Sequence, residues 1–324
     1  MICIDKQSHD PWFNLAADEF VLKNLTDDVF MLWQNAECIV FGKHQLPLQE
    51  FDLQLVEHEN IPVIRRISGG GTVYHGPGNV NFSFVTTESA DKINFGKYLL
   101  PIQLYLRGLG MNAEVLSKSN LVIHGLKISG NAASVHRNRS LHHGTLLFET
   151  DKNRLDFVLQ KPKQTYHTKA VISNRVETTN ISKYLTRALS FEEFCNDLQT
   201  SVSQYFGVSE IRSFTAAEIN KIFKLSNEKF KSREWNFGYS PDYSTEREVF
   251  FSGEKINISL HVKQGRIDSV ILSNEQLSEN IEILKEALIG IPHDRQSVSK
   301  RLIQVRERIN CDDIEFNSLI NNIL

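Results

Sequence analysis

The first 150 residues carry a dense series of short apolar runs, and these runs restrict the possible folds more than any other feature of the chain. Short runs rich in branched and aromatic side chains, bounded by turn-forming residues, are typical of β-strands. They form two clusters, VFMLWQ, ECIVFG, IPVIRR, GTVYH and VNFSFV, and then AEVL, NLVIHG, LKISGNAASVH and SLHHGTLLF. Helical segments do not alternate regularly with these runs. The pattern therefore predicts an α+β fold with mixed sheets and packed helices rather than a βαβ array.

Helices are expected beside these strands, and the first begins at Pro11, where a residue without an N–H is tolerated. Further helices are expected at about residues 51–60, 95–109, 151–160 and 191–206. The sequence becomes polar and loop-like at WNFGYSPDYSTERE. We therefore expect a large domain over residues 1–244 and a small α/β domain over residues 245–324.

The composition excludes several functional classes. A net charge of -3 argues against nucleic acid as the main partner, because nucleic-acid-binding proteins usually present a strongly basic face. Charged residues near the start argue against a signal peptide, and no apolar run is long enough to span a membrane. The scattered cysteines form no CxxC pair, which indicates a reducing compartment; they are Cys3, Cys38, Cys195 and Cys311. We expect a protein of the cytoplasm, or of the inside of an organelle after import, that binds neither nucleic acid nor membranes.

The segment 61–84 combines two arginines, Arg65 and Arg66, with three consecutive glycines and a strand that carries Tyr74 and His75. Glycines let several backbone N–H groups approach an anion closely, and an arginine adds a planar donor fork for phosphate or carboxylate. On composition alone, a flexible hairpin beside a surface arginine is an equal alternative. No GKS or GKT follows, so this is not a Walker A loop, and a strand follows where a dinucleotide site needs a helix.

The segment 125–148 places Lys127 in a strand of apolar and small residues. A lysine there either reaches solvent or meets an anionic ligand. The small residues after it leave room for a bulky group beside the strand. His142 and His143 follow, and surface polarity is their more ordinary explanation, because no carboxylates or thiols at metal-binding spacing support a metal site.

Together the two segments resemble the lipoate–protein ligase family. That family carries an arginine pair, a Ser-Gly-Gly-Gly run, a Val-aromatic-His strand and a Gly-Asn turn, followed later by Lys-Ile-Ser-Gly and His-His-Gly-Thr-Leu-Leu. The matching residues here are Arg65, Arg66, Ser68–Gly71, Thr72, Val73, Tyr74, His75, Gly78, Asn79, Phe82, Lys127–Gly130 and His142–Leu147. Weaker matches are Asn14–Ala16, Glu19, Gly42, Gln45, Ser173, Arg175, Val176, Asn180 and Ile181. Departures are Leu46, Asn120 and one extra residue between Arg175 and Asn180.

The resemblance implies a biotin/lipoate-ligase-like catalytic domain at 1–244 and the accessory C-terminal domain of the long family members at 245–324. It implies an enzyme that uses ATP and Mg²⁺ to convert lipoate to lipoyl-AMP and then transfers the lipoyl group to a carrier lysine. The implied carriers are the E2 subunits of 2-oxoacid dehydrogenases and the glycine-cleavage H protein. A monomer is expected.

The resemblance also implies which residues act. Lys127 is the expected catalytic residue, because it matches the family lysine that contacts carboxylate and phosphate. An acyl slot is expected along 129–133 and 80–84. The expected ligand-binding residues are Arg66, Ser68, Gly69, Gly70, Gly71, Thr72, Val73, Tyr74, His75, Asn79, Lys127, Ser129, Gly130, Ala132, His143 and Gly144.

Three alternatives remain open. Acyltransferases of the same fold move lipoyl or octanoyl groups between carriers through a cysteine nucleophile. In the half of the chain that carries the two motifs, Cys38 is the only cysteine near a matched segment. Biotin ligases share the fold, but arginines interrupt their glycine loop. A chain that had lost ATP binding would act as a binding or scaffold protein.

Overall fold

The computed structural model describes residues 1–5, 8–88, 93–117, 119–251, 254–273, 279–309 and 313–323. These residues form two compact units. The first unit contains Met1–Lys43, Glu50–Gln160 and Ile172–Ser232, and the second contains His44–Gln49, Lys161–Val171 and Arg233–Leu324. Cys311 lies outside the described residues.

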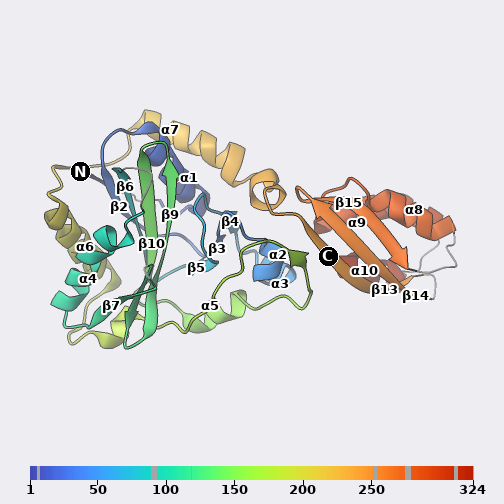
Figure 1. Ribbon diagram of the computed structural model, residues 1–324, viewed down its shortest axis with the longest axis horizontal. Coiled ribbons are helices and arrows are strands. Elements are labelled where there is room, and N and C mark those ends of the chain that lie inside the picture. Colours follow the sequence, from blue (N-terminus) through green and yellow to red (C-terminus); the bar gives the residue numbers. More distant parts are fainter. Residues whose placement is uncertain are drawn as a thin grey trace. The chain divides into compact units, whose positions relative to one another are not determined.

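The first unit is built on a mixed sheet whose described strands follow the order β12-β1-β2-β6-β10-β9-β8-β7 (Figure 1). Strand β1 runs parallel to β2 and β12, whereas the pairs from β2 through β6, β10, β9 and β8 to β7 are antiparallel. The strands are β1 (Ile2–Asp5), β2 (Val29–Trp33), β6 (Asn79–Thr87), β7 (Ala113–Leu116), β8 (Asn120–Ile123), β9 (Leu126–His136), β10 (Arg139–Leu147) and β12 (Glu210–Arg212).

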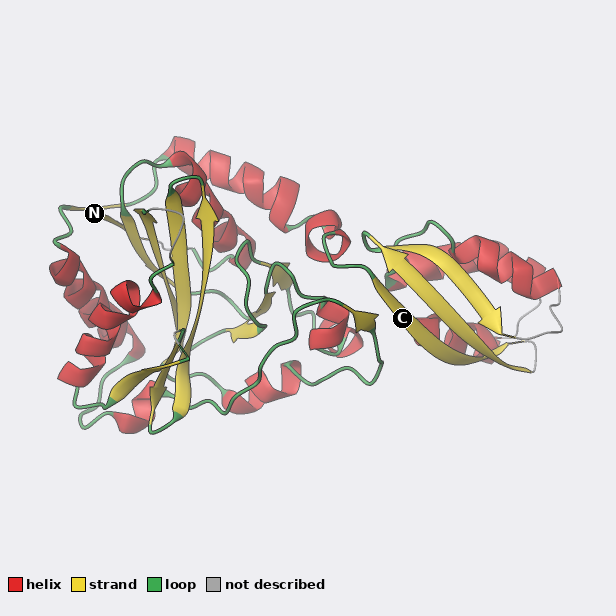
Figure 2. Cartoon of the chain, viewed as in Figure 1, coloured by secondary structure: helices red, strands yellow, loops and turns green. Residues whose placement is uncertain are grey.

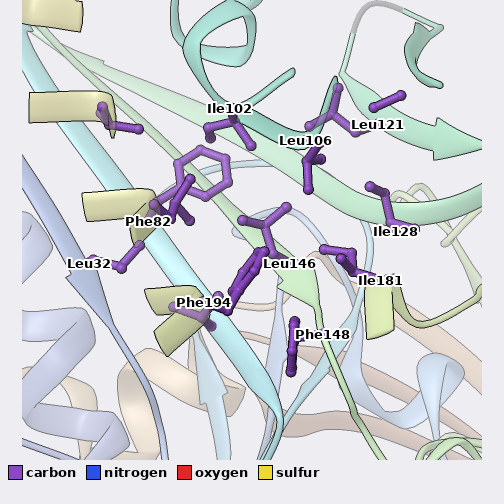
Figure 3. Close-up of a cluster of buried hydrophobic side chains, with 14 of the residues drawn as sticks. Leu32, Phe82, Ile102, Leu106, Leu121, Ile128, Leu146, Phe148, Ile181 and Phe194 are labelled. Atoms are coloured by element: carbon purple, nitrogen blue, oxygen red, sulfur yellow. The ribbon is translucent and has the colours of Figure 1, made fainter. Parts of the chain in front are cut away.

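The alternation of side chains along β6 explains why the sheet has two different faces. Val80, Phe82 and Phe84 point to one face, where they join a core built with α4 (Phe95–Gly108) and α6 (Phe191–Phe206) (Figure 3). The polar side chains of the same strand, Asn79, Asn81 and Ser83, alternate with these apolar residues and lie on the opposite face. The sequence of β6 therefore gives this sheet one apolar face and one polar face.

Helix α1 (Pro11–Asn24) lies against β6 and β10 and packs against α7 (Ala216–Leu225). Its start is fixed as expected, because Asp10 accepts hydrogen bonds from two backbone N–H groups and Pro11 occupies the first turn. The remaining helical segments of this unit are α3 (Leu53–His58), α5 (Lys152–Val158), the 3₁₀ turn Ile181–Tyr184 and the π-helical turn Ser226–Phe230.

A second, three-stranded sheet of the same unit has the order β4-β3-β5 and carries the glycine run. Strand β3 (Cys38–Phe41) pairs in parallel with β4 (Val63–Arg65) and antiparallel with β5 (Val73–His75). Residues 66–72 connect β4 to β5. Because these residues join the two strands that flank β3, the glycine loop lies at one end of this sheet.

The second unit contains an antiparallel sheet in the order β11-β13-β14-β15, with helices packed on it (Figure 2). Alternate residues of β14, from Ile256 to Val262, are buried, as expected for a sheet with one covered face. The elements are β11 (His167–Thr168), β13 (Tyr243–Phe251), β14 (Glu254–Lys263), β15 (Arg266–Ser273), α8 (Glu279–Leu288), α9 (Arg295–Ile309), α10 (Asp313–Ile323) and the π-helical turn Glu234–Gly238.

The expected α+β architecture, with a large mixed sheet and a small C-terminal α/β unit, is confirmed. The helix expected at 51–60 is shorter and follows a separate turn of helix, α2 (Pro47–Glu50). The division at residue 244 stays a prediction. The compact units separate after Ser232, and the earlier segments His44–Gln49 and Lys161–Val171 belong to the C-terminal unit. The second of these segments contains β11, which pairs with β13. Among the described helices, none has the length and apolar character needed to cross a membrane.

Candidate active site

A cavity of about 520 Å³ lies in the first unit, between the polar face of the large sheet and the glycine loop. The sheet contributes Trp33, Asn81, Lys127, Ser129–Ala132 and His143–Thr145, and the loop with strand β5 contributes Arg66 and Gly70–His75. Helix α5 and the segment 173–178 complete the wall. This volume lies within the usual range for sites that bind small molecules and cofactors.

Arg66 organises the glycine loop from inside. Its guanidinium donates hydrogen bonds to the backbone carbonyls of Gly69 (2.6 Å) and Gly71 (2.7 Å) and to the hydroxyl of Ser68 (3.0 Å). Burial lowers the pKa of Arg66 to about 10, which still leaves the side chain charged at neutral pH. Since carbonyl oxygens of the loop bind this cation, the loop is held in one shape with a fixed positive charge behind it.

Two glycines of the loop meet specific constraints. Gly70 has φ +84, a left-handed conformation that L side chains rarely adopt. A Cβ on Gly71 would lie 2.9 Å from Oγ of Ser173. The loop therefore needs glycine at these positions, in one case for its backbone conformation and in the other for close approach of a second segment.

Glu50 joins the loop to the segment 173–178. Its carboxylate accepts hydrogen bonds from the Thr72 hydroxyl (3.0 Å), the Ser173 backbone N–H (3.1 Å) and the Ser173 hydroxyl. The backbone N–H of Thr72 in turn donates to Oγ of Ser173 at 2.7 Å. Two segments about 100 residues apart in the sequence are thus fastened into one wall of the cavity by a buried carboxylate.

A hydrogen-bonded chain runs from the loop into the sheet. Ser68 Oγ lies 2.6 Å from Nε2 of His143, and Nδ1 of the same ring lies 2.9 Å from a carboxylate oxygen of Asp18. The other oxygen of Asp18 accepts from Ser83 (2.8 Å). Asp18 is almost fully buried, and its carboxylate accepts a hydrogen bond from Nδ1 of His143. This contact favours the tautomer of His143 in which Nδ1 carries the proton. This chain ties α1, β10 and the glycine loop together.

Lys127 differs from the other cations of the described cavity wall. The side chains of Arg66, Lys152 and Arg175 donate to backbone carbonyls, whereas no hydrogen bond links the ammonium group of Lys127 to a described residue. No carboxylate among the described residues forms an ion pair with its ammonium group. Burial, together with repulsion from Arg66, lowers the pKa of Lys127. Its backbone pairs with the segment 177–179, and its Nζ lies over Gly130, where a Cβ would come within 2.9 Å. A partly buried cation held in this way is suited to an anionic ligand.

Comparison with known proteins agrees with this geometry. Residues 10–203 match the lipoyl protein ligase A/B catalytic domain family, and residues 240–323 match the bacterial lipoate protein ligase C-terminus. The chain belongs to the lipoate–protein ligase family. It is 34% identical over 317 residues to lipoate–protein ligase 1 of Staphylococcus aureus, and the match covers 96% of each chain. Membership makes it a ligase that attaches lipoate to protein with ATP.

Solved structures of lipoate–protein ligases share the fold. P. falciparum LipL1, crystallised with lipoate, has 22% identity and a TM-score of 0.65 over 99% of this chain and 98% of its own. A bipartite ligase from Thermoplasma acidophilum, described with its E2 lipoyl domain, has 23% identity and a TM-score of 0.63. The match covers 74% of this chain and 96% of the ligase chain. A lipoate–protein ligase A bound with ATP has 23% identity and a TM-score of 0.61, and the match covers 74% of this chain and 98% of the ligase chain.

Most residues expected from the ligase resemblance lie on the cavity wall. They are Arg66, Gly70, Gly71, Thr72, Val73, Tyr74, His75, Lys127, Ser129, Gly130, Ala132, His143 and Gly144. Ser68, Gly69 and Asn79 do not line it. Ser68 and Gly69 are loop residues that accept hydrogen bonds from Arg66, and Asn79 donates to Asn81 at 3.1 Å. The expectation that 80–84 lines an acyl slot is wrong except at Asn81, because Val80, Phe82 and Phe84 face the core.

The thiols do not favour the acyltransferase alternative. Cys38 is fully buried, and burial raises its pKa far above the ordinary value of a thiol. Burial also raises the pKa of Cys3 to about 11 and that of Cys195 to about 12. None of these three described cysteines lines the cavity. A thiol nucleophile needs a lowered pKa and access to the acyl group, and these thiols have neither.

Several site residues were missed from the sequence. Asp18 and Glu50 are polar residues inside apolar segments, and an acidic residue at a position where the pattern predicts burial is the signal that could have singled them out. The contributions of α5 and of Ser173–Thr178 depend on tertiary contacts, although Ser173, Arg175 and Val176 were weak matches to the family pattern.

Proposed function

We propose that this ligase forms lipoyl-AMP in the cavity of its first unit, with Lys127 as the catalytic cation. The carboxylate oxygen of lipoate attacks the α-phosphorus of ATP, an O–P bond forms, and pyrophosphate leaves. Negative charge lies on the carboxylate and on the phosphate, so one ammonium group between them stabilises both. One observation carries the proposal: Lys127 and the glycine loop line the same cavity, and Lys127 forms no ion pair with a described carboxylate.

The glycine loop is the proposed nucleotide site. Gly70 and Gly71 lie on the wall and bring backbone atoms, without side chains, close to a ligand. Arg66 contributes in two ways, because it holds the loop carbonyls away from the ligand and places a positive charge behind the loop. Thr72, Val73, Tyr74 and His75 continue this wall along β5. ATP binding by a solved ligase of the same fold supports the assignment.

Magnesium fits the site only as an ion carried on the phosphates. No cluster of three or more His, Cys, Asp or Glu side chains suited to a metal occurs among the described residues. Asp156 and Glu177 are the acidic residues of the described cavity wall. Mg²⁺ keeps several waters and commonly binds one or two carboxylates together with substrate phosphates. These two side chains are therefore the residues that would meet it, and the ion would neutralise phosphate charge there.

The second step transfers the lipoyl group to a carrier lysine. The lysine amine attacks the carbonyl carbon of lipoyl-AMP, an amide bond forms, and AMP leaves. The carriers proposed here are E2 lipoyl domains and the H protein. The solved ligase that is described with its E2 lipoyl domain supports the first of these. The enzyme is proposed to act in the cytoplasm as a monomer.

Pyrophosphate release without a carrier tests the function. We expect lipoate and ATP together to give pyrophosphate, and we expect AMP release to need added E2 lipoyl domain. A matched carrier whose target lysine is replaced by arginine should allow no AMP release above background. Transfer from an octanoyl carrier in the absence of ATP would show the acyltransferase activity instead.

A further inference from the structure

Asn81 offers a hydrogen-bond donor to the cavity that no described residue uses. Its side chain is 1% exposed and lines the cavity. The amide oxygen accepts from Nδ2 of Asn79 at 3.1 Å, whereas Nδ2 of Asn81 has no hydrogen-bond partner among the described residues. A buried N–H group without an acceptor is unfavourable, so this position is suited to a ligand that supplies one.

The surroundings of Asn81 restrict the kind of ligand. In the sheet, Asn81 lies opposite Trp33 on β2, and the indole N–H of that tryptophan already donates to Ser83 at 2.9 Å. Leu15 and Val40 also line the cavity. The cavity that Asn81 lines thus also has apolar side chains, among them the indole ring opposite Asn81, and Nδ2 of Asn81 adds one donor group to this wall. Such a place fits the far end of an acyl chain that carries one weak acceptor.

The distance from Lys127 agrees with an acyl chain that lies across the strands. The ammonium of Lys127 lies over Gly130 on β9, Gly130 N donates to Thr145 Oγ1 on β10 at 3.3 Å, and Thr145 pairs with Asn81 on β6. Two strand spacings separate β9 from β6, which is roughly 10 Å. An extended eight-carbon acid with its carboxylate at Lys127 would thus bring its far end to Asn81.

We propose that Asn81 donates a hydrogen bond to a sulfur of the dithiolane ring and so makes the site prefer lipoate to octanoate. Divalent sulfur is a weak acceptor, and the corresponding end of octanoate is a methyl group with no acceptor. A site that leaves its buried donor unpaired with the wrong substrate discriminates against that substrate. This inference rests on the proposed function, because it takes lipoate to be the acid activated at Lys127.

The test compares kcat/KM for lipoate and octanoate, measured as carrier-free pyrophosphate release. The variants are Asn81→Leu, which has the same branching but larger methyl groups and no donor, and Asn81→Ala, which removes the donor without overfilling the site. Each should lower the lipoate-to-octanoate ratio about tenfold. Asn196→Leu, on an exposed position of α6, is the matched control and should leave the ratio at its wild-type value. Thermal melting confirms that each protein is folded.

A ratio within twofold of wild type in a folded Asn81 variant would overturn the inference. So would equal losses for both acids, because they would show that Asn81 only supports the strand. A measurement on the unchanged enzyme is independent of variant folding: calorimetry should show about tenfold weaker binding of a carbocyclic lipoate analogue, with CH₂ groups in place of both sulfurs, than of lipoate. Equal binding would contradict the proposal. Absence of pyrophosphate release by wild type with either acid would instead contradict the proposed function.

Discussion

At the scale of single residues, the site depends on cations that have different tasks. Arg66 is fully engaged with the loop, and its hydrogen bonds to carbonyls make it a structural support. Lys127 has no acidic partner among the described residues, and its lowered pKa reflects burial beside a second cation. Only the second arrangement leaves a charge available to a ligand. The two cations therefore have different roles, since Arg66 supports the loop and Lys127 can meet a ligand.

Replacement of Lys127 by alanine should leave the fold intact and remove most adenylation. Loss of a charge-assisted contact that acts on the transition state costs roughly 2–4 kcal/mol, which corresponds to about 30- to 1,000-fold in kcat/KM. Pyrophosphate release by the folded variant measures this loss. Near-normal release would remove Lys127 from the mechanism.

The lowered pKa of Lys127 also predicts a pH dependence. In the free enzyme the ammonium loses its proton at a lower pH than an ordinary lysine, so kcat/KM should fall as the pH rises through that lowered pKa. Bound anions favour the charged form, so the corresponding fall in kcat should occur at a higher pH. Lys127→Arg should abolish the alkaline fall, since arginine stays charged. An alkaline limb that persists in the arginine variant would assign it to another group.

Cys38→Ser should retain ligase activity, because the thiol is buried, has a raised pKa and lies outside the cavity lining. The change affects packing and the contact that Asn35 makes with the thiol at 3.5 Å. Intact-protein mass spectrometry of the wild type is the companion measurement. A folded, inactive variant together with an acyl-thioester on wild-type Cys38 would favour the acyltransferase.

At the scale of elements, the sequence predicts the strands and the loop between β4 and β5 but not what surrounds them. Short apolar runs specify strands locally, and the Gly69–Gly71 run specifies a turn with close backbone approach. The pattern could not show that Glu50 fastens this loop to Ser173, because that contact joins residues far apart in the chain. For the same reason the whole stretch 80–84 was expected to line the acyl slot, whereas only Asn81 of it lines the cavity. Alternation separates two faces but does not say which of them meets the ligand.

Gly70→Val and Gly71→Val should both abolish ligand binding, for different reasons. Valine resists the positive φ of Gly70, and at Gly71 its Cβ would collide with Ser173. Calorimetry with a stable lipoyl-AMP analogue measures the effect. Gly207→Val, at another left-handed position, is a control for strain alone and should lower stability while binding is kept. Binding by the loop variants within a few-fold of wild type would show that the loop is only a turn.

At the scale of the whole molecule, buried neutral histidines make the fold sensitive to acid. Burial lowers the pKa of His75 and of His142 to about 3 and that of His293, in the second unit, to about 4. Unfolded histidines bind protons near pH 6.5, so the stabilisation is complete above that pH and is lost as the pH falls toward the folded values. Each of these buried histidines should lower the free energy of unfolding by about 2 kcal/mol at pH 5 relative to its value above pH 6.5.

The His142 ring packs against Phe82, Phe95 and Tyr98, which makes His142→Phe a conservative test. Urea unfolding of the wild type and of this variant at pH 7 and pH 5 measures the dependence. The variant should lose less stability between the two pH values by about 2 kcal/mol. An equal loss in both proteins would assign the acid sensitivity to other groups.

Mass spectrometry of the enzyme incubated with lipoate and ATP, in the absence of a carrier, shows directly whether lipoyl-AMP forms and stays bound. Under native conditions we expect a mass increase equal to one lipoyl-AMP, and under denaturing conditions we expect the unmodified chain, because the intermediate is bound without a covalent bond. Lys127→Ala should show little of the complex. A covalent lipoyl-protein under denaturing conditions, or no adenylate in the wild type, would contradict adenylation in this cavity.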